Sequence, residues 1–506
     1  MKYNKKTVGL TVTTNYEGAP SYTLSPEFEL YAAVVTASLG NKFYESEEQL
    51  TERIRSLIKI NKPEFVAKLA VYTREKMYLR SVPLALVCEL ANIHSGNNLL
   101  RKMTSRVIQR ADEITELLAC YLQANNRTGT KKLNKISKQL QKGIADAFNK
   151  FNEYQFAKYN RAGEITLKDA LFLTHPKAIT ETQQTLFNKI VEDKLEVPYT
   201  WEVELSRLGQ TTFINEEEKA TAFKEKWEEI IKSNKLGYMA LLRNLRNIIK
   251  ARVNGECQEI VYNKLSDPEE VRKSKQFPFR FYSAYKMIEG ELWVDRYTDA
   301  LEKAIQVSVE NVKGFEEDTR VVIACDVSGS MGEKVSPKSI IRNYDIGLVL
   351  GMLLQNRCRQ TITGIFGSEW KIVKLPKTNI LSNISRLDAL SNEVGWSTNG
   401  YKILKDLINR KIVADKICIF TDLQLWDTSS DYDTQGMKVL WNTYKKEVAP
   451  EAKIYLFDLA GYGNTPLSIF QNGVYFIAGW SEKIFEVMDA IDKGSTAIKE
   501  IEKIVL

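Results

Sequence analysis

Three oxygen-bearing side chains stand at alternate positions in one short segment of the chain. Asp326, Ser328 and Ser330 follow an apolar run that starts near residue 320, and Gly329 between the serines permits a tight turn. A carboxylate and two hydroxyls are hard ligands, which suit magnesium or manganese better than zinc. Alone, such a pattern is also typical of a turn or of the first residue of a helix.

Two later positions provide the ligands that this segment lacks. Thr398 precedes an amphipathic segment, and Asp422 ends a second apolar run. In an open parallel sheet, ligands bind beyond the carboxyl ends of the strands, where such residues would meet. We therefore predict one divalent-cation site, for Mg2+ with Mn2+ as the alternative, formed by Asp326, Ser328, Ser330, Thr398 and Asp422.

The last third of the chain has the alternation of elements that such a sheet requires. Short runs rich in Val, Ile and Phe predict buried strands at residues 320–327, 362–367, 416–423, 452–460 and 473–478. Amphipathic segments between and after them predict helices at residues 339–355, 380–390, 401–409, 437–448 and 481–491. This order predicts a Rossmann-like α/β domain over residues 319–506, with helices on both faces of a parallel sheet.

The five predicted ligands resemble the metal-ion-dependent adhesion site of the von Willebrand factor A family. The resemblance implies that Ser328, Ser330 and Thr398 bind the ion directly, while Asp326 and Asp422 act through waters or hydrogen bonds. An ion with few charged ligands keeps a position for a partner's carboxylate, so the site is expected to dock a partner. The set supplies no base or nucleophile, and we expect no enzymatic activity.

The first two thirds of the chain are predicted to be helical. Apolar residues recur at three- and four-residue spacing in successive segments, which favours stacked helix pairs of the HEAT type over residues 1–318. The segments are residues 31–39, 50–60, 64–77, 83–93, 98–122, 133–151, 181–191, 216–233, 238–253 and 294–312.

Composition limits the classes of function. The net charge is +7, of which residues 1–320 carry +6, so binding of nucleic acid must depend on local patches. The six cysteines are scattered without a CxxC spacing, which favours free thiols in a reducing cytoplasm. No apolar run approaches the ~20 residues of a membrane span.

One such patch lies between residues 127 and 161, which contain nine Lys and Arg residues but two acidic residues. Lys131, Lys135, Lys138 and Lys142 would share one stripe of a helix at ~100° per residue. The stripe is either the solvated outer face of a packed helix or a surface that binds phosphates.

The residues after this patch resemble the TROVE module of the Ro ribonucleoprotein family. The closest likeness is the run AKYNR at 157–161, KDAL at 168–171 and LTHPK at 173–177. Further likeness comes from NYEG at 15–18, LAVYTRE at 69–75, RSVP at 80–83, MALLRNL at 239–245 and FPFR at 277–280.

The resemblance implies a ring of HEAT-like helices closed by the C-terminal domain. It also implies that Y RNAs bind a basic outer surface, and that single-stranded ends of misfolded RNAs enter the central hole. Lys158 and His175 fall on positions that contact RNA in the family, and Arg161 lies one residue from another. Lys for phosphates and His for stacking on unpaired bases agree with this role.

The leading hypothesis is a noncoding-RNA-binding adaptor in RNA quality control or processing, with an exoribonuclease as a possible protein partner. A scaffold that docks acidic proteins through the metal site, without RNA, is the alternative. A metal-dependent nuclease is disfavoured because two-metal hydrolysis needs clustered carboxylates.

Overall fold

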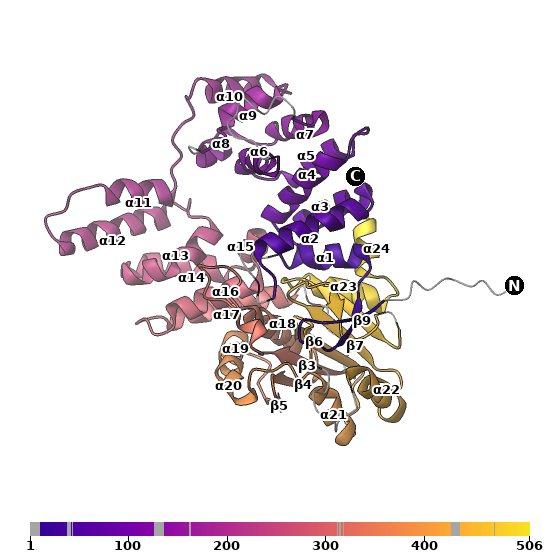
Figure 1. The fold of residues 1–506 in the computed structure, drawn as a ribbon. Helices are drawn as coiled ribbons and strands as arrows, with labels where there is room; N and C mark the ends of the chain where they lie inside the picture. The colour runs from indigo at the N-terminus through magenta and orange to yellow at the C-terminus, as the bar shows by residue number, and fades with distance from the viewer. Residues whose placement is uncertain are drawn as a thin grey trace. The chain divides into compact units, whose positions relative to one another are not determined.

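The computed structural model describes residues 11–37, 42, 44–125, 136–160, 163–310, 312, 315–316, 318–426, 436–469 and 471–506 (Figure 1). The chain packs as two compact units. Residues 1–54 and 265–500 form the sheet unit, and residues 55–264 with 501–506 form the helical unit. The units follow packing, whereas the predicted division at residue 318 follows element type, and that division stays a prediction.

The sheet unit is built on six strands in the order β5-β4-β3-β6-β7-β9. All neighbouring strands are parallel except the edge pair β4 and β5. The strands are β3 (Arg320–Asp326), β4 (Gln360–Phe366), β5 (Trp370–Ile372), β6 (Lys416–Thr421), β7 (Lys453–Asp458) and β9 (Val474–Ala478). Every predicted strand is confirmed to within two residues at each end. The short edge strand β5 was not predicted.

Helix α18 (Asn343–Arg357) covers the centre of this sheet on one face. A Cβ at Gly351 would lie 2.7 Å from the Cys325 Sγ, so glycine here lets the helix approach the strands closely. Because parallel crossovers are right-handed, α21 (Tyr401–Asn409) and α22 (Met437–Glu447), which pack against each other, lie on the opposite face (Figure 1). The other predicted helices of this part are α19 (Ile380–Ala389) and α23 (Ile484–Asp492). The short helices α20 (Ser391–Val394) and α24 (Ala497–Glu502) were not predicted.

Helices from the middle of the chain complete the sheet unit. They are α15 (Pro268–Ser274), α16 (Pro278–Ile288) and α17 (Asp295–Glu310). Helix α17 packs against α15, α16, α18 and α19. The Lys286 Nζ on α16 lies 2.7 Å from an oxygen of Asp388 on α19, which ties these helices to the α/β elements.

The start of the chain also belongs to the sheet unit. Strands β1 (Val12–Thr14) and β2 (Pro20–Thr23) form an antiparallel hairpin, and β2 pairs with β8 (Asn464–Thr465). Helix α1 (Pro26–Val35) follows, and its Tyr31 hydroxyl donates to the Ala478 carbonyl at 2.8 Å. The pairing of β2 with β8 joins positions more than 400 residues apart, so it cannot be predicted from a short-range sequence pattern.

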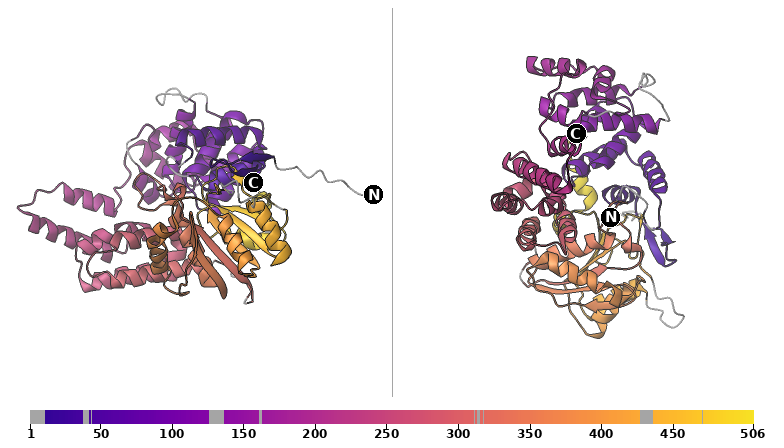
Figure 2. Two further views of the ribbon diagram at one scale, coloured as in Figure 1. Left: turned by 60° about the horizontal axis from the view of Figure 1, so that its bottom comes forward. Right: turned by 90° about the vertical axis from the view of Figure 1, so that its left-hand side faces the viewer.

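The helical unit consists of successive helices that each pack on near neighbours in the chain (Figure 2). Helix α3 packs against α4 and α5, α4 against α6, and α5 against α7, as expected for stacked helix pairs. Its helices are α3 (Pro63–Glu75), α4 (Ser81–Ile93), α5 (Leu99–Val107), α6 (Asp112–Ala124), α7 (Lys138–Phe148), α8 (Glu153–Tyr159), α9 (Leu167–Thr174), α10 (Glu181–Val191), α11 (Trp201–Gly209), α12 (Glu216–Lys232) and α13 (Tyr238–Lys250). Helices α2 (Glu47–Ile60) and α14 (Gly255–Ser266) cross the boundary between the units.

Several helix predictions were wrong in detail. The helix expected over residues 31–39 lies at Pro26–Val35, and the one expected over residues 339–355 lies at Asn343–Arg357. Residues 98–122 form two helices rather than one, because the buried Glu113 carboxylate accepts the backbone N–H groups of Gln109 and Arg110 at 2.7 and 3.1 Å. Those two N–H groups are thereby withdrawn from a continuous helix. The helix expected over residues 133–151 begins only at Lys138, since Ser137 precedes it with a non-helical ψ of 127°.

Candidate functional sites

The predicted metal ligands begin where β3 ends in the centre of the sheet. Asp326 is fully buried, and its Oδ1 accepts the backbone N–H of Ser328 at 2.9 Å. Its Oδ2 accepts the Thr421 hydroxyl from β6 at 2.5 Å. The hydroxyl oxygens of Ser328 and Ser330 lie 3.4 Å apart. The carboxylate thus holds the turn that brings both serine hydroxyls to one place.

Backbone hydrogen bonds join this turn to the two later loops. The Gly329 N–H donates to the Trp396 carbonyl at 2.8 Å, and the Trp426 N–H donates to the Thr398 carbonyl at 2.9 Å. Thr398 and Asp422 are 3% and 1% exposed, respectively. The structure therefore gathers the loops of all five predicted ligands at the carboxyl ends of β3 and β6, as the topology predicts.

The two carboxylates of this site lack a cationic side chain as a hydrogen-bond partner among the described residues. The Asp422 Oδ1 accepts the Gln424 N–H at 2.9 Å, whereas its buried Oδ2 has no hydrogen-bond partner in the part of the chain that is described. Burial, with the charge of Asp422, raises the pKa of Asp326 to about 7. Burial raises the pKa of Asp422 to about 6, and the Glu17 charge adds to this shift. A bound cation would relieve the unfavourable burial of both groups.

The donor set fits a hard divalent cation. It offers carboxylate and hydroxyl oxygens, and the Asp422 Oδ2 is buried without a hydrogen-bond partner among the described residues. Among the described residues, no three His, Cys, Asp or Glu side chains lie close enough together to hold a metal ion by themselves. Any cation here would therefore depend on serine and threonine hydroxyls, which favours magnesium or manganese.

Sequence reasoning missed two residues beside this site, Glu17 and Tyr44. The Tyr44 hydroxyl donates to the Glu17 carboxylate and also forms a hydrogen bond with Ser330. Both residues come from the start of the chain, in a turn and a loop without a motif for metal binding. The pairing of β2 with β8, together with the hydrogen bonds of Asn15 to Leu425 and of Tyr16 to Gln424, holds this segment within the sheet unit.

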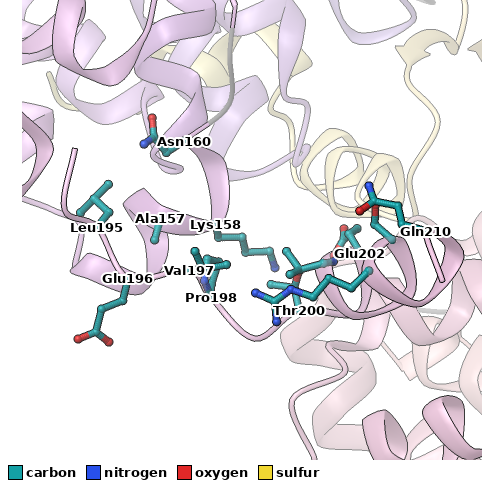
Figure 3. Close-up of a pocket in the computed structure, with 13 residues that line it drawn as sticks. Ala157, Lys158, Asn160, Leu195, Glu196, Val197, Pro198, Thr200, Glu202 and Gln210 are labelled. Carbon is teal, nitrogen blue, oxygen red and sulfur yellow. The ribbon is translucent and has the colours of Figure 1, made fainter.

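In the helical unit, Lys158 lines a pocket of about 630 Å³ (Figure 3). The pocket lies between the end of α8 and the chain around α11, and Figure 3 shows the Lys158 side chain among the residues of its wall. The Lys158 Nζ is 5.6 Å from the ring centroid of Tyr159 and 6.0 Å from that of Tyr154. The lining residues are Ala157, Lys158, Asn160, Leu195, Glu196, Val197, Pro198, Thr200, Glu202, Val203, Ser206, Arg207 and Gln210.

His175 is exposed and ends α9 in a left-handed conformation, with φ of 47°. The Gln141 side chain on α7 donates to the Leu173 carbonyl at 2.8 Å, and the Asn149 side chain donates to the Lys177 carbonyl at 2.9 Å. These two bonds fix the loop of His175 along α7. His175 is not among the residues that line the Lys158 pocket.

The predicted lysine stripe is described only in part. Lys138 and Lys142 are exposed on the first turns of α7, on either side of Gln141 in sequence. Both therefore lie near the His175 loop. Lys131, Lys135 and Arg161 lie outside the described residues.

Arg110 is a basic residue that sequence reasoning did not single out. Its guanidinium carbon lies 4.7 Å from the ring centroid of Tyr159, and Tyr159 is the residue that follows Lys158. Asp112 also pairs with Arg110 at 3.0 Å. A cation stacked on a tyrosine carries no signal in local sequence, because the two residues are 49 positions apart.

Comparison with known proteins identifies the class that this fold defines. The TROVE domain model matches residues 32–193 and 193–292, which is just over half of the chain, so the chain belongs to the TROVE domain family. The matched region includes Lys158, His175 and most of the helical unit.

Two relatives and one solved structure extend this comparison. The chain is 23% identical over 305 residues to telomerase protein component 1 of Mus musculus and of Rattus norvegicus. Each match covers 45% of this chain and only 11% of the relative. The fold resembles the crystal structure of the Deinococcus radiodurans RO (RSR) protein, with a TM-score of 0.58 and 18% identity over 93% of this chain and 100% of that chain. This likeness confirms the predicted fold class, a helical-repeat part with a C-terminal Rossmann-like domain.

Among the described helices, none has the length and apolar character needed to cross a bilayer. The six cysteines are free thiols, five of them buried.

Proposed function

We propose that this chain is a ribonucleoprotein scaffold that binds a structured noncoding RNA through its helical unit and performs no catalysis. The observation that carries the proposal is membership in the TROVE domain family over the region that contains Lys158 and His175. The likeness to a telomerase component and to the fold of a Ro protein supports the same class. Lys158 over two tyrosine rings supplies a cation and aromatic faces, which suit phosphates and unpaired bases.

The proposed RNA partners are Y-like RNAs and the single-stranded ends of misfolded structured RNAs, in a quality-control or processing role. The exposed residues His175, Lys138 and Lys142 along α7 would contact backbone phosphates, with Lys158 in its pocket nearby in sequence. An exoribonuclease is the proposed protein partner. The free thiols support a reducing compartment, and we propose the cytoplasm.

We further propose that Asp326, Ser328, Ser330, Thr398 and Asp422 hold one divalent cation, Mg2+ or Mn2+. The unpartnered Asp422 Oδ2 supports this assignment. A bound cation would supply an electrophilic position for an acidic group, while the chain's own loops orient the hydroxyls. The site would dock a partner instead of hydrolysing a substrate, since two-metal hydrolysis needs more carboxylates than it offers.

Fluorescence anisotropy with a labelled RNA hairpin that carries a single-stranded tail tests the RNA proposal. Binding should weaken steadily as salt rises from 50 to 200 mM, because each phosphate contact releases counterions. Lys158→Ala combined with His175→Ala should weaken binding about 10-fold and lower the salt slope by about 1. Lys219→Ala, which removes an equal charge from α12, is the control and should change little.

Failure of the RNA test would favour the second candidate function. If the wild-type chain shows no binding at low salt, the RNA proposal is wrong, and a scaffold for acidic proteins docked at the metal site becomes the better hypothesis. The buried, unpartnered Asp422 Oδ2 favours this alternative specifically, because it belongs to the metal site and not to the helical unit.

A further inference from the structure

The segment that precedes α1 lies against the proposed metal site within the sheet unit. Asn15 is 6% exposed, and its side-chain amide donates to the Leu425 carbonyl at 2.8 Å. The Tyr16 N–H donates to the Gln424 side chain at 2.9 Å. Gln424 and Leu425 lie two and three residues after Asp422, so this segment is anchored to the loop that carries a predicted metal ligand.

The same segment forms a tight turn that presents Glu17. The Asn15 side-chain oxygen accepts the N–H groups of Glu17 at 3.1 Å and of Ala19 at 2.9 Å. Gly18 completes the turn with φ of 81°, a conformation that favours glycine. An asparagine that binds both its own turn and Leu425 fixes Glu17 relative to the Asp422 loop.

Tyr44 connects Glu17 to the metal site. Its hydroxyl contacts both the Glu17 carboxylate and Ser330, one of the predicted direct ligands. The Tyr44 ring stacks on Tyr16 at 5.1 Å and meets the edge of Tyr462 at 5.5 Å. These two ring contacts position the Tyr44 side chain, and with it the hydroxyl.

A second observation comes from the loop to which this segment is anchored. The unpartnered Oδ2 of Asp422, which is 1% exposed, is an independent indication of a missing ligand.

We infer that Glu17 is the chain's own acidic ligand for the cation, so that residues 11–24 cover the position which a partner's carboxylate would otherwise take. This inference rests on the proposed metal site. A partner could then dock only after the segment releases the ion, and the segment would regulate docking from within the chain. An external carboxylate and Glu17 would compete for one coordination position.

Binding of Mn2+ to the full chain, measured by isothermal titration calorimetry and by electron paramagnetic resonance of free Mn2+, tests the inference. Glu17→Gln keeps an oxygen that can accept the Tyr44 hydroxyl but removes the charge. We expect it to weaken Mn2+ binding about 10-fold. Glu48→Gln, an exposed acid on α2, is the matched control and should bind as the wild type does. Asp326→Ala should lose the site altogether.

Acetate provides a second measurement. We expect acetate to strengthen Mn2+ binding by the Glu17→Gln variant, because it fills the position that the variant leaves open, and to leave the wild type unchanged. Hydrogen exchange should also show that Mn2+ protects the amides of residues 15–22 in the wild type but not in the variant.

The outcomes separate the two proposals. If the wild type binds no Mn2+, the metal site itself is wrong and the inference falls with it. If the wild type binds Mn2+, Asp326→Ala abolishes binding and Glu17→Gln binds equally well without an acetate effect, only the inference is overturned.

Discussion

Buried acidic side chains have different hydrogen-bond partners in the two units of this chain. In the helical unit, Glu113 is fully buried, and its carboxylate pairs with Arg74 at 2.7 Å while accepting two backbone N–H groups. In the sheet unit, Asp326 and Asp422 are equally buried, and within the described part of the chain their hydrogen bonds come from hydroxyls and backbone N–H groups.

This difference separates a structural acid from a functional one. A buried carboxylate is unfavourable unless its charge is compensated within the fold. Arg74 compensates Glu113, so no ligand is needed there. Asp326 and Asp422 have raised pKa values because burial is not compensated, and this condition favours binding of a cation.

The largest effect should come from breaking the compensated pair. Glu113→Ala leaves the Arg74 charge buried and unpaired, and removes the acceptor that separates α5 from α6. We expect a loss of about 3–5 kcal/mol in the free energy of unfolding, measured by urea denaturation. Glu64→Ala removes an exposed acid from α3 and should cost less than about 1 kcal/mol. Equal losses in both variants would mean that Glu113 is not a structural acid.

Removal of an uncompensated acid should instead alter ligand binding. Asp326→Asn should weaken Mn2+ affinity about 100-fold in a calorimetric titration, because the variant loses the charge that holds the serine turn and the ion. Its metal-free stability should fall far less than that of the Glu113 variant. Asp406→Asn on the surface of α21 should bind Mn2+ normally. Normal Mn2+ binding by Asp326→Asn would show that the contrast between the units has no functional meaning.

A smaller effect is expected at Glu482, an uncompensated acid of the sheet unit outside the metal site. Burial raises its pKa to about 7, and its Oε2 has no hydrogen-bond partner among the described residues. Because the pKa in the folded state exceeds that of the unfolded chain, this group stabilises the fold at low pH. The contribution is lost as the pH rises from about 4.5 to about 7.

Glu482→Gln should remove this loss. We expect the variant to be more stable than the wild type by on the order of 1 kcal/mol at pH 8, and to gain nothing at pH 4.5. Thermal unfolding of both chains across this pH range would measure the difference. A gain that does not depend on pH would show that the charge of Glu482 is not its cause.

The sequence was informative wherever a signal is local. The parallel strands follow from short Val- and Ile-rich runs, and the loops of the proposed metal site follow from strand ends in a known topology. Asp326 and Asp422 could therefore be predicted before any coordinates were considered. The break between α5 and α6 could not be predicted, because the apolar spacing continues through it. The break is caused by one buried carboxylate, that of Glu113, which accepts two backbone N–H groups.

Contacts between distant parts of the chain escaped prediction for a related reason. Glu17 and Tyr44 carry no metal-binding pattern, and their role depends on strand pairing across more than 400 residues. Of the predicted RNA-contacting residues, four are described: Lys138, Lys142, Lys158 and His175. Lys158 lines the pocket at the end of α8, and the other three are not among its lining residues. Local periodicity places such residues on helices but does not say which loops will lie beside them.

The pairing of β2 with β8 also has a consequence for synthesis of the chain. Tyr22 pairs with Thr465, so the hairpin that contains β2 must wait for its partner while the intervening residues are made. At about 5–20 residues per second, that interval is on the order of 20–90 seconds. Helices of the helical unit can form during this time, because their contacts are local. The hairpin of β1 and β2 would thus complete its pairing long after it is made, and it would need protection from aggregation until then.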